Sequence, residues 1–223
     1  MIGCSFAGNF SGRELSTEYL FGLYGDPVHP SVVSIPTSYE ILDFVAYDNT
    51  ASAITVVEFK STITNDTLPV RVESLMEWND DRQIAKYEVS IRLLGYLIDT
   101  LIARIAETAG VTLDEATSRF GKTIATSICQ LHDEHCTGAN QQYRDSADCL
   151  NFLTEKIRLG RDYETGRNTL LCRSIHQIML PYRPDVHCPH IGPSGGGKCV
   201  DGQTYEQMAR GGCFANAHVT PHP

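Results

Sequence analysis

The first half of the chain alternates apolar and polar residues in short runs, which is the pattern of β-strands. The runs cover residues 38–48, 53–64, 70–78 and 84–92. They are rich in Val, Ile and Thr, and polar turns with Asn and Asp separate them. Such spacing is typical of antiparallel strands connected by hairpins. The pattern therefore predicts a four-stranded β-meander.

Beyond residue 92 the apolar positions recur every three or four residues, which predicts helices. The predicted helices cover residues 93–105, 112–132, 146–158 and 165–179. Gly110 ends the first, and the capping box Thr112-Leu113-Asp114-Glu115 opens the second. From Tyr182 onward no period holds, so we expect irregular structure there.

These patterns divide the chain into three parts. Residues 1–37 are rich in Gly, Pro and Ser and predict an extended lead-in with a short helix within 18–25. Residues 38–110 hold the β-meander and one helix, and residues 111–223 form a cysteine-rich helical extension. Nothing near Leu93 resembles a flexible linker, so we expect both halves to pack as one α+β domain.

Composition narrows the classes of function. The chain has 223 residues, of which 42% are hydrophobic, enough for one domain with a real core. Its net charge of −9, without a basic stripe, argues against a nucleic-acid partner. No apolar run approaches the roughly 18 residues of a membrane span.

Two sequons, at Asn9 and Asn65, and the even number of eight cysteines favour an oxidising compartment. The start at Met1 lacks the basic residues and long apolar core of a secretory signal. We therefore expect a glycoprotein that is secreted or lies in the secretory lumen, with its signal peptide outside this chain.

Seven cysteines lie between Cys129 and Cys213, and three interpretations compete for this segment: a phosphate loop, a metal site or a disulfide scaffold. The glycine-rich run from Gly192 to Lys198 matches G-x-x-x-x-G-K, but Cys199 stands where a phosphate loop carries Ser or Thr. No apolar strand precedes it, so we interpret the run as a loop.

The histidines could bind metal, because His132 and His135 could face one side of a helix end, while His187 and His190 flank Cys188. No C-x₂-C pair accompanies them, and cysteines in an oxidising compartment pair with each other. We therefore expect no metal ligands and no cofactor, with histidines at the surface or at helix ends. A metal-dependent enzyme built on the histidines stays open as an alternative, and a catalytic thiol at Cys172 is disfavoured by the even count.

A disulfide scaffold is thus the favoured interpretation. Eight cysteines allow 105 connectivities. The pairing that spacing suggests is Cys136–Cys149, Cys188–Cys199, Cys129–Cys172 and Cys4–Cys213.

The remaining candidate site residues lie on the predicted sheet. A curved sheet wrapped by helices would form a conical pocket. The candidate substrate contacts are Trp78, Phe59, Met76 and Glu58. In regular strands Phe59 and Tyr87 point away from the face of Lys60 and Arg92, so one shared pocket needs a bulge. The alternative is cross-strand salt pairing on a solvated face.

Two resemblances add to this picture. The segment 77–89, with Asn79-Asp80 followed by Ile84, Tyr87 and Glu88, resembles the last strands of NTF2-like (SnoaL-like) proteins, over about residues 12–105. The cysteine and histidine pattern of the second half resembles a group of cysteine-rich secreted fungal proteins. That pattern comprises Cys129, His132, Cys136 with residues 137–143, Cys149, residues 166–169, Cys172, Arg173 and residues 187–193.

The second group is similar to the cofactor-independent hetero-Diels–Alderases of tropolone–sesquiterpenoid biosynthesis. The resemblance implies an NTF2-like curved sheet with packed helices, and an enzyme that joins an o-quinone methide to a terpene alkene. The implied partner is a small apolar natural product, and homodimer formation is left open. A secreted protein that binds a small ligand without catalysis, like an effector, is the alternative.

For that reaction we expect two kinds of polar residue. Arg92, Lys60 or Arg173 would polarise a carbonyl or tropolone oxygen. Tyr87, Glu88 or His176 would act as general acid or base in the dehydration that forms the diene. Arg173 and His176 would reach across from a helix.

Overall fold

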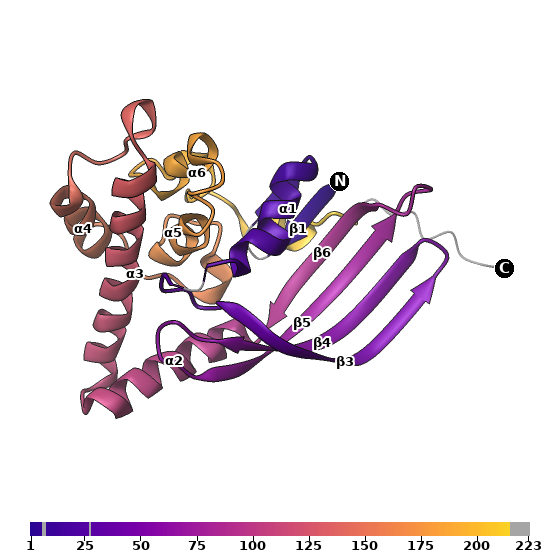
Figure 1. The fold of residues 1–223 in the computed structure, drawn as a ribbon, viewed down its shortest axis with the longest axis horizontal. Helices are drawn as coiled ribbons and strands as arrows, with labels where there is room; N and C mark the ends of the chain where they lie inside the picture. Colours follow the sequence, from indigo (N-terminus) through magenta and orange to yellow (C-terminus); the bar gives the residue numbers. More distant parts are fainter. Residues whose placement is uncertain (6–7, 27, 215–223) are drawn as a thin grey trace.

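The computed structural model of the protein describes residues 1–5, 8–26 and 28–214. Its curved six-stranded sheet comprises β1 (Ile2–Ser5), β2 (Gly8–Ser11), β3 (Ile35–Tyr47), β4 (Thr50–Lys60), β5 (Thr67–Trp78) and β6 (Ile84–Arg92). The strand order is β2-β1-β6-β5-β4-β3 (Figure 1). β3 to β6 are antiparallel neighbours, which confirms the predicted β-meander, and β1 runs parallel to β6.

The strand boundaries follow the prediction closely, with one instructive difference. β6 begins and ends at the predicted residues, whereas β4 stops at Lys60 instead of continuing to Thr64. The hydroxyl of Ser61 accepts hydrogen bonds from the backbone N–H groups of Ile63 and Thr64. Serine side chains stabilise turns in this way, so these β-branched residues lie in a turn rather than a strand.

The predicted extended lead-in is wrong, because residues before 37 are part of the fold. β1 pairs with β6, and α1 (Arg13–Phe21) with the 3₁₀ turn Gly22–Tyr24 packs beside it. Strands of four residues show no periodicity, which is why the sequence alone did not reveal them.

Helices follow the sheet and gather at one end of it (Figure 1). They are α2 (Leu94–Ala109), α3 (Leu113–His135), α4 (Ser146–Glu155), α5 (Leu170–Gln177), α6 (Pro184–Ile191) and α7 (Tyr205–Arg210). Gly110 ends α2 with a left-handed backbone at φ 64°, and Thr112 caps α3 by accepting from the N–H of Glu115, as predicted. The α+β class is confirmed.

Two helix predictions need correction. α5 begins at Leu170, not Thr165, because the Thr169 hydroxyl caps it by accepting from the Cys172 N–H. The expected irregular structure after Tyr182 is also wrong, since α6 and α7 lie there. α6 is short and begins with Pro184 in its first turn, so its periodicity is weak.

The pleat gives the sheet two chemically different faces. One face, called here the apolar face, carries Tyr39, Ile41, Phe44, Ala46, Ala51, Ala53, Thr55, Val57, Phe59, Leu68, Val70, Val72, Ser74, Met76, Tyr87, Val89 and Ile91. The opposite, polar face carries Glu58, Lys60, Arg71, Glu73, Glu77, Lys86, Glu88 and Arg92. The apolar face packs against the helices at one end and extends beyond them at the other (Figure 1).

One hydrophobic cluster joins the two halves of the chain. It runs from Phe59, Val70 and Ile91 on the sheet to Ile98 of α2 and Phe120 of α3. Leu101, Phe120 and Ile124 are fully buried, so the helical half is packed on the sheet rather than tethered to it. Within the described ranges, no helix is long and apolar enough to cross a bilayer.

All eight cysteines form disulfides, and one predicted pair is confirmed. Cys4–Cys213 is as expected, whereas the other bridges are Cys129–Cys149, Cys136–Cys188 and Cys172–Cys199. Cys129 and Cys136 lie two turns apart on α3, so α4 meets the first and α6 meets the second. The predicted Cys136–Cys149 and Cys188–Cys199 pairs, which would close short loops, and the predicted helix-to-helix pair Cys129–Cys172 are wrong, because the packing of α3, α4, α5 and α6 set the partners.

Four disulfides agree with an oxidising compartment. Asn9 and Asn65 are both exposed, so a glycosyl transferase could reach either one. Secretion and glycosylation stay predictions, as does the homodimer. β3 pairs only with β4 among the described residues, and it exposes Tyr39, Phe44 and Val45, which makes it the edge where a second copy would pair.

The Cys4–Cys213 bridge joins residues 209 positions apart and ties β1 to the segment after α7. Replacing both cysteines with serine should lower the free energy of unfolding by about 2–5 kcal/mol, because the bridge restricts the unfolded chain. Urea unfolding of the Cys4→Ser/Cys213→Ser variant measures this. Equal midpoints for variant and parent would show that the bridge adds no stability.

Candidate functional site

The predicted sheet residues do not line one pocket, because the pleat separates them onto two faces. Phe59, Met76 and Tyr87 lie on the apolar face, whereas Trp78 follows a register shift and pairs with Ile84, on the face of Lys86. Glu58, Lys60, Glu88 and Arg92 point to the polar face. The irregularity between Glu77 and Trp78 comes too late in β5 to bring the two sets together. A shared conical pocket is therefore not formed.

On the polar face the predicted catalytic residues make surface contacts. Arg92 donates to Glu73 at 2.9 Å with both side chains partly exposed, which is the cross-strand ion pair weighed as the alternative. The Glu88 carboxylate accepts from the backbone N–H of Cys213 at 3.2 Å. Lys60 is exposed at the end of β4. Their catalytic roles stay predictions.

On the apolar face, Tyr87 is buried and has a structural partner. Its hydroxyl donates to the backbone carbonyl of Ser16 in α1 at 3.0 Å. Gly3 of β1 lies opposite Tyr87, and a Cβ there would come within 2.2 Å of the ring. Glycine at this position therefore lets the Tyr87 ring lie across β1 and reach α1.

The enclosed space in the helical end of the molecule is small. An apolar cavity of about 40 Å³ lies between the segment 23–33, α2 and α5, lined by Leu23, Val33, Ile98 and Leu171 among others. Ligand pockets usually measure about 300–1,000 Å³. None of the predicted site residues lines this cavity, so it does not serve as the expected pocket.

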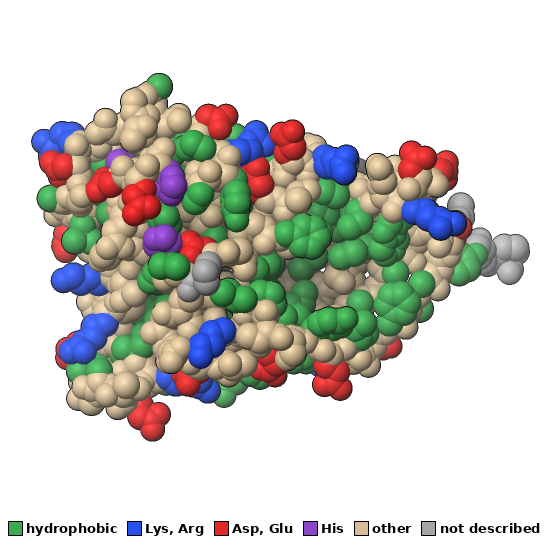
Figure 2. Space-filling view, viewed as in Figure 1, with side chains coloured by type: hydrophobic (Ala, Val, Ile, Leu, Met, Phe, Trp, Pro, Cys, Tyr) green, Lys and Arg blue, Asp and Glu red, His purple; other side chains and the backbone are tan. Residues whose placement is uncertain are grey.

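A larger apolar surface lies outside, over the strands that extend beyond the helices. Figure 2 shows hydrophobic side chains gathered around a hollow in this part of the molecule. Phe44 is 61% exposed there, and Ala53, Met76 and Val89 of the apolar face are partly exposed. The hydroxyls of Thr55 and Ser74 lie among them as diagonal neighbours on β4 and β5. Sequence reasoning missed both, although alternation alone places them on the apolar face.

Arg173 lies in the helical layer and not beside the hollow. It is fully buried, and its guanidinium donates to the carbonyls of Thr169 and Gly192 and to the side chain of Asn168. These bonds hold α5 to the start of the glycine-rich loop. These contacts are structural, and a catalytic role for Arg173 stays a prediction.

His176 belongs to a buried cluster of three histidines, and this corrects the expectation of surface or capping histidines. His176 of α5 is 1% exposed, and His187 and His190 of α6 are 0% and 8% exposed. The Nδ1 atoms of His176 and His190 lie 3.2 Å apart, and the Tyr19 hydroxyl of α1 lies 2.9 Å from the same His176 nitrogen. α1 thus places polar side chains beside those of α5 and α6, 157 or more residues further along the chain.

The three imidazoles are uncharged near neutral pH. Burial, with Arg183 nearby, lowers the pKa of His187 to about 4. Burial, with His187 and Lys198 nearby, also lowers the pKa of His190 to about 4, and burial holds the pKa of His176 well below its usual range. Each ring therefore has one N–H group that can donate and one nitrogen lone pair that can accept.

His187 is oriented by a carboxylate. Its Nε2 lies 2.9 Å from Glu18 of α1, and because the ring is neutral this contact is an N–H donated to Glu18. That assignment leaves the lone pair on Nδ1, which is buried and has no hydrogen-bond partner. A buried polar atom without a partner costs about 1–3 kcal/mol, so this nitrogen is a candidate ligand atom.

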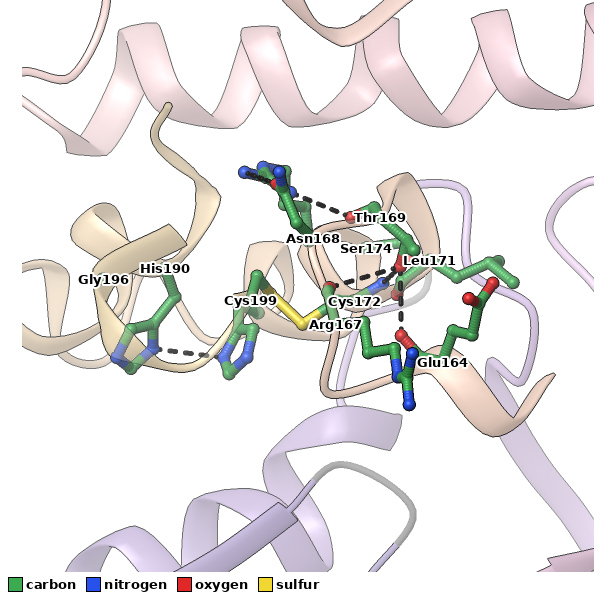
Figure 3. The surroundings of a disulfide bond; sticks show 12 residues. Glu164, Arg167, Asn168, Thr169, Leu171, Cys172, Ser174, His190, Gly196 and Cys199 are labelled. Carbon is green, nitrogen blue, oxygen red and sulfur yellow. Dashed lines mark hydrogen bonds between the residues drawn. A yellow bond between two sulfur atoms is a disulfide. The ribbon is translucent and has the colours of Figure 1, made fainter. Parts of the chain in front are cut away.

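The glycine-rich run packs directly on this cluster. Gly195 to Gly197 form a tight turn with a left-handed backbone, with φ between 54° and 76°. A Cβ at Gly196 would lie 2.8 Å from His190, so only glycine allows the loop to approach that closely. Figure 3 shows Gly196 and His190 beside the Cys172–Cys199 disulfide. Lys198 does not face a phosphate pocket, because its ammonium group donates to the Asn9 carbonyl at 3.0 Å.

The comparisons with known proteins identify the family. The model of the BfoA N-terminal domain matches residues 4–89, and the model of the BfoA family C-terminal domain matches residues 92–202. The chain belongs to the BfoA family. The two domain models meet where the sheet ends and α2 begins, at Arg92 and Leu94.

Related BfoA-family proteins occur in Aspergillus. The aurasperone B biosynthesis cluster protein A of Aspergillus niger is 50% identical over 199 residues, covering 89% of this chain and 65% of the relative. The bifonsecin B biosynthesis cluster protein A of Aspergillus brasiliensis is also 50% identical over 199 residues, covering 67% of that protein. The chain therefore spans about two thirds of the length of these relatives.

The neutral histidines make stability depend on pH. In the unfolded chain a histidine binds a proton near pH 6.5, whereas folded His187 stays neutral down to about pH 4. Acid therefore favours the unfolded state, and this stability is present above pH 6.5 and lost as pH falls toward 4. For His187 alone we expect a loss of about 2–3 kcal/mol between pH 7 and pH 4.5.

Urea unfolding at both pH values, on the parent and on His187→Gln, measures this loss. Glutamine keeps a donor for Glu18 but does not titrate. The fall in unfolding free energy should be smaller in the variant. The same fall in both proteins would mean that His187 is protonated when folded.

Proposed function

We propose that this BfoA-family protein acts in fungal secondary-metabolite biosynthesis by binding apolar reactants in the hollow of the apolar face. The chemistry proposed is a hetero-Diels–Alder cycloaddition between an o-quinone methide of tropolone type and a terpene alkene. The observation that carries this proposal is that the apolar face continues beyond the helices, with Phe44, Met76 and Val89 open to solvent. Related proteins are named for biosynthesis clusters, which supports the biosynthetic role.

A cycloaddition suits such a surface because it demands little from charged side chains. Both reactants are apolar, and each buried square ångström contributes about 25 cal/mol to binding. Holding the two partners together replaces a bimolecular encounter by a reaction within one complex, which can lower the barrier by about 7–11 kcal/mol. The apolar side of an NTF2-like curved sheet would provide the concave support.

The hydroxyls of Thr55 and Ser74 replace the predicted cations as polarising groups. Arg92 and Lys60 lie on the opposite face and do not reach the hollow. Thr55 and Ser74 project from the apolar face on adjacent strands, so each hydroxyl can donate to the carbonyl oxygen of a quinone methide. Donors aimed at an oxygen that gains charge in the transition state accelerate such reactions.

The same geometry supports a second candidate, a secreted protein that binds a small apolar ligand without catalysis. The observation in its favour is that the predicted acids, bases and cations are not in the hollow. Both functions predict that a ligand binds in the hollow, but only the enzyme predicts turnover. Measuring both binding and product therefore separates them.

We expect Met76→Lys to abolish function, because a charge in the hollow disfavours apolar ligands by several kcal/mol. The producing fungus would carry Met76→Lys or Ser90→Lys in place of the parent gene, and culture extracts would be compared by mass spectrometry. Ser90 is exposed on the polar face of β6, opposite Glu73, so it is the control for an added lysine on the same sheet. The metabolite that disappears when the gene is deleted should fall more than tenfold in Met76→Lys and persist in Ser90→Lys.

A purified-protein measurement distinguishes enzyme from binder. Fluorescence of the uncharged apolar dye N-phenyl-1-naphthylamine should report binding to the parent and not to Met76→Lys. Loss of dye binding with an unchanged metabolite profile would refute the enzyme and support the binder. Equal dye binding and equal profiles in both variants would remove the hollow from the function.

A further inference from the structure

We propose that His176, His187 and His190 form a binding site for one divalent transition-metal ion of the Zn²⁺ class. The three side chains place ligand atoms within 4.8 Å of one another, and all three are buried. This site lies in the helical layer between α1, α5 and α6, apart from the hollow of the apolar face. It therefore stands independently of the proposed cycloaddition.

The first support is the spacing of two nitrogen atoms. The Nδ1 atoms of His176 and His190 are 3.2 Å apart. Two imidazole nitrogens that each bind a tetrahedral zinc ion at about 2.0–2.1 Å lie roughly 3.3–3.4 Å from each other. The rings are thus already separated as neighbouring ligands of one ion are.

The second support is the unpartnered Nδ1 atom of His187. Its Nε2–H is donated to Glu18, so the Nδ1 lone pair remains available and buried. Metal-ligating histidines characteristically donate their other N–H to a carboxylate, which fixes the ring and strengthens the ligand. Glu18 and His187 reproduce that arrangement from two separate helices.

His132 shows what a buried structural histidine looks like in the same protein. It is 2% exposed, its Nε2 accepts from the backbone N–H of Gln142 at 3.1 Å, and its Nδ1 contacts Asp133 at 3.0 Å. Both ring nitrogens therefore have partners. His187 is equally buried but leaves one nitrogen unused, and that difference distinguishes a ligand from a packing residue.

Tyr19 lies against the cluster from α1. Its hydroxyl is 2.9 Å from Nδ1 of His176, and its ring lies edge-on to His187 with centroids 5.9 Å apart. The three imidazoles form a nitrogen ligand set that suits Zn²⁺, Cu²⁺ or Co²⁺ rather than Mg²⁺ or Ca²⁺.

Charged groups of both signs surround the cluster. Glu18 is the carboxylate in direct contact, while Arg173, Arg183, Asp185 and Lys198 act on the histidines from nearby. The Lys198 ammonium group donates to the Asn9 carbonyl.

The neighbouring disulfide defines which atoms are ligands. Cys172 and Cys199 also lie within reach of His176, but their sulfurs are bonded to each other. A cysteine sulfur binds zinc strongly only as a thiolate, and these two sulfurs form a disulfide. The ligands that the oxidised protein offers are therefore the histidines. A test must therefore confirm that no free thiol is present.

The test uses the full chain, stripped with a chelator, shown by alkylation to lack free thiols, and titrated with Co²⁺ and then Zn²⁺. We expect about one equivalent of Co²⁺ with visible absorption bands, which Zn²⁺ abolishes. His187→Gln should lose this binding while its far-UV circular dichroism is unchanged. His132→Gln, which removes the satisfied histidine, should still bind one equivalent.

Glu18→Gln tests the supporting carboxylate in a variant that keeps all three ligands. Loss of the carboxylate should weaken Zn²⁺ affinity about 10–100-fold. The proposal is overturned if the thiol-free parent binds less than a tenth of an equivalent of both metals, or if His187→Gln and Glu18→Gln bind as the parent does. These readouts do not depend on any activity of the apolar face.

Discussion

The structure depends on the contact that α1 makes with both halves of the molecule. On one side, the Tyr87 hydroxyl donates to the Ser16 carbonyl and joins α1 to the sheet. On the other, Tyr19 and Glu18 meet His176 and His187 of the helical layer. These contacts are buried, where an unpaired polar group costs about 1–3 kcal/mol, so they fix the position of α1 within narrow limits. The Tyr87 contact in turn requires glycine at position 3, because any side chain there would collide with the ring.

This arrangement separates two surfaces that the sequence suggested would be one. The pleat sends the charged residues of β4 and β6 to one face and the apolar residues to the other. The helices cover the apolar face only at one end, so the rest of it forms the open hollow (Figure 2). The buried histidines lie where α1 meets α5 and α6, and not in that hollow. Ligand binding and the polar cluster therefore occupy different parts of the molecule.

Three of the disulfides and the glycine-rich loop stabilise the helical layer. Cys136–Cys188 fixes α6 to α3, and Cys172–Cys199 fixes the end of the loop to α5. Gly196 lies so close to His190 that the loop closes one side of the histidine cluster. The segment that resembled a phosphate loop in sequence thus packs against the histidines. This agrees with its interpretation as a loop, which the cysteine at position 199 favoured.

Local features of the chain were predictable because they depend on neighbours in sequence. The alternation of residues 84–92 gave β6 to the residue, and Gly110 and Thr112 set the junction between α2 and α3. The same alternation placed Phe59 and Arg92 on opposite faces. Short elements such as β1 and α6 have too few residues to show a period, so they were not predicted.

The partners of side chains distant in sequence were decided by tertiary packing alone. Short loops suggested Cys136–Cys149 and Cys188–Cys199, but helix packing brought Cys136 to Cys188 and Cys172 to Cys199. His176, His187 and Tyr19 share no sequence motif, since 157 residues separate Tyr19 from His176. The sequence by itself determined the α+β class, most of the elements and the even set of cysteines. Packing decided which polar groups meet, because burial rewards only those arrangements in which separate helices place them together.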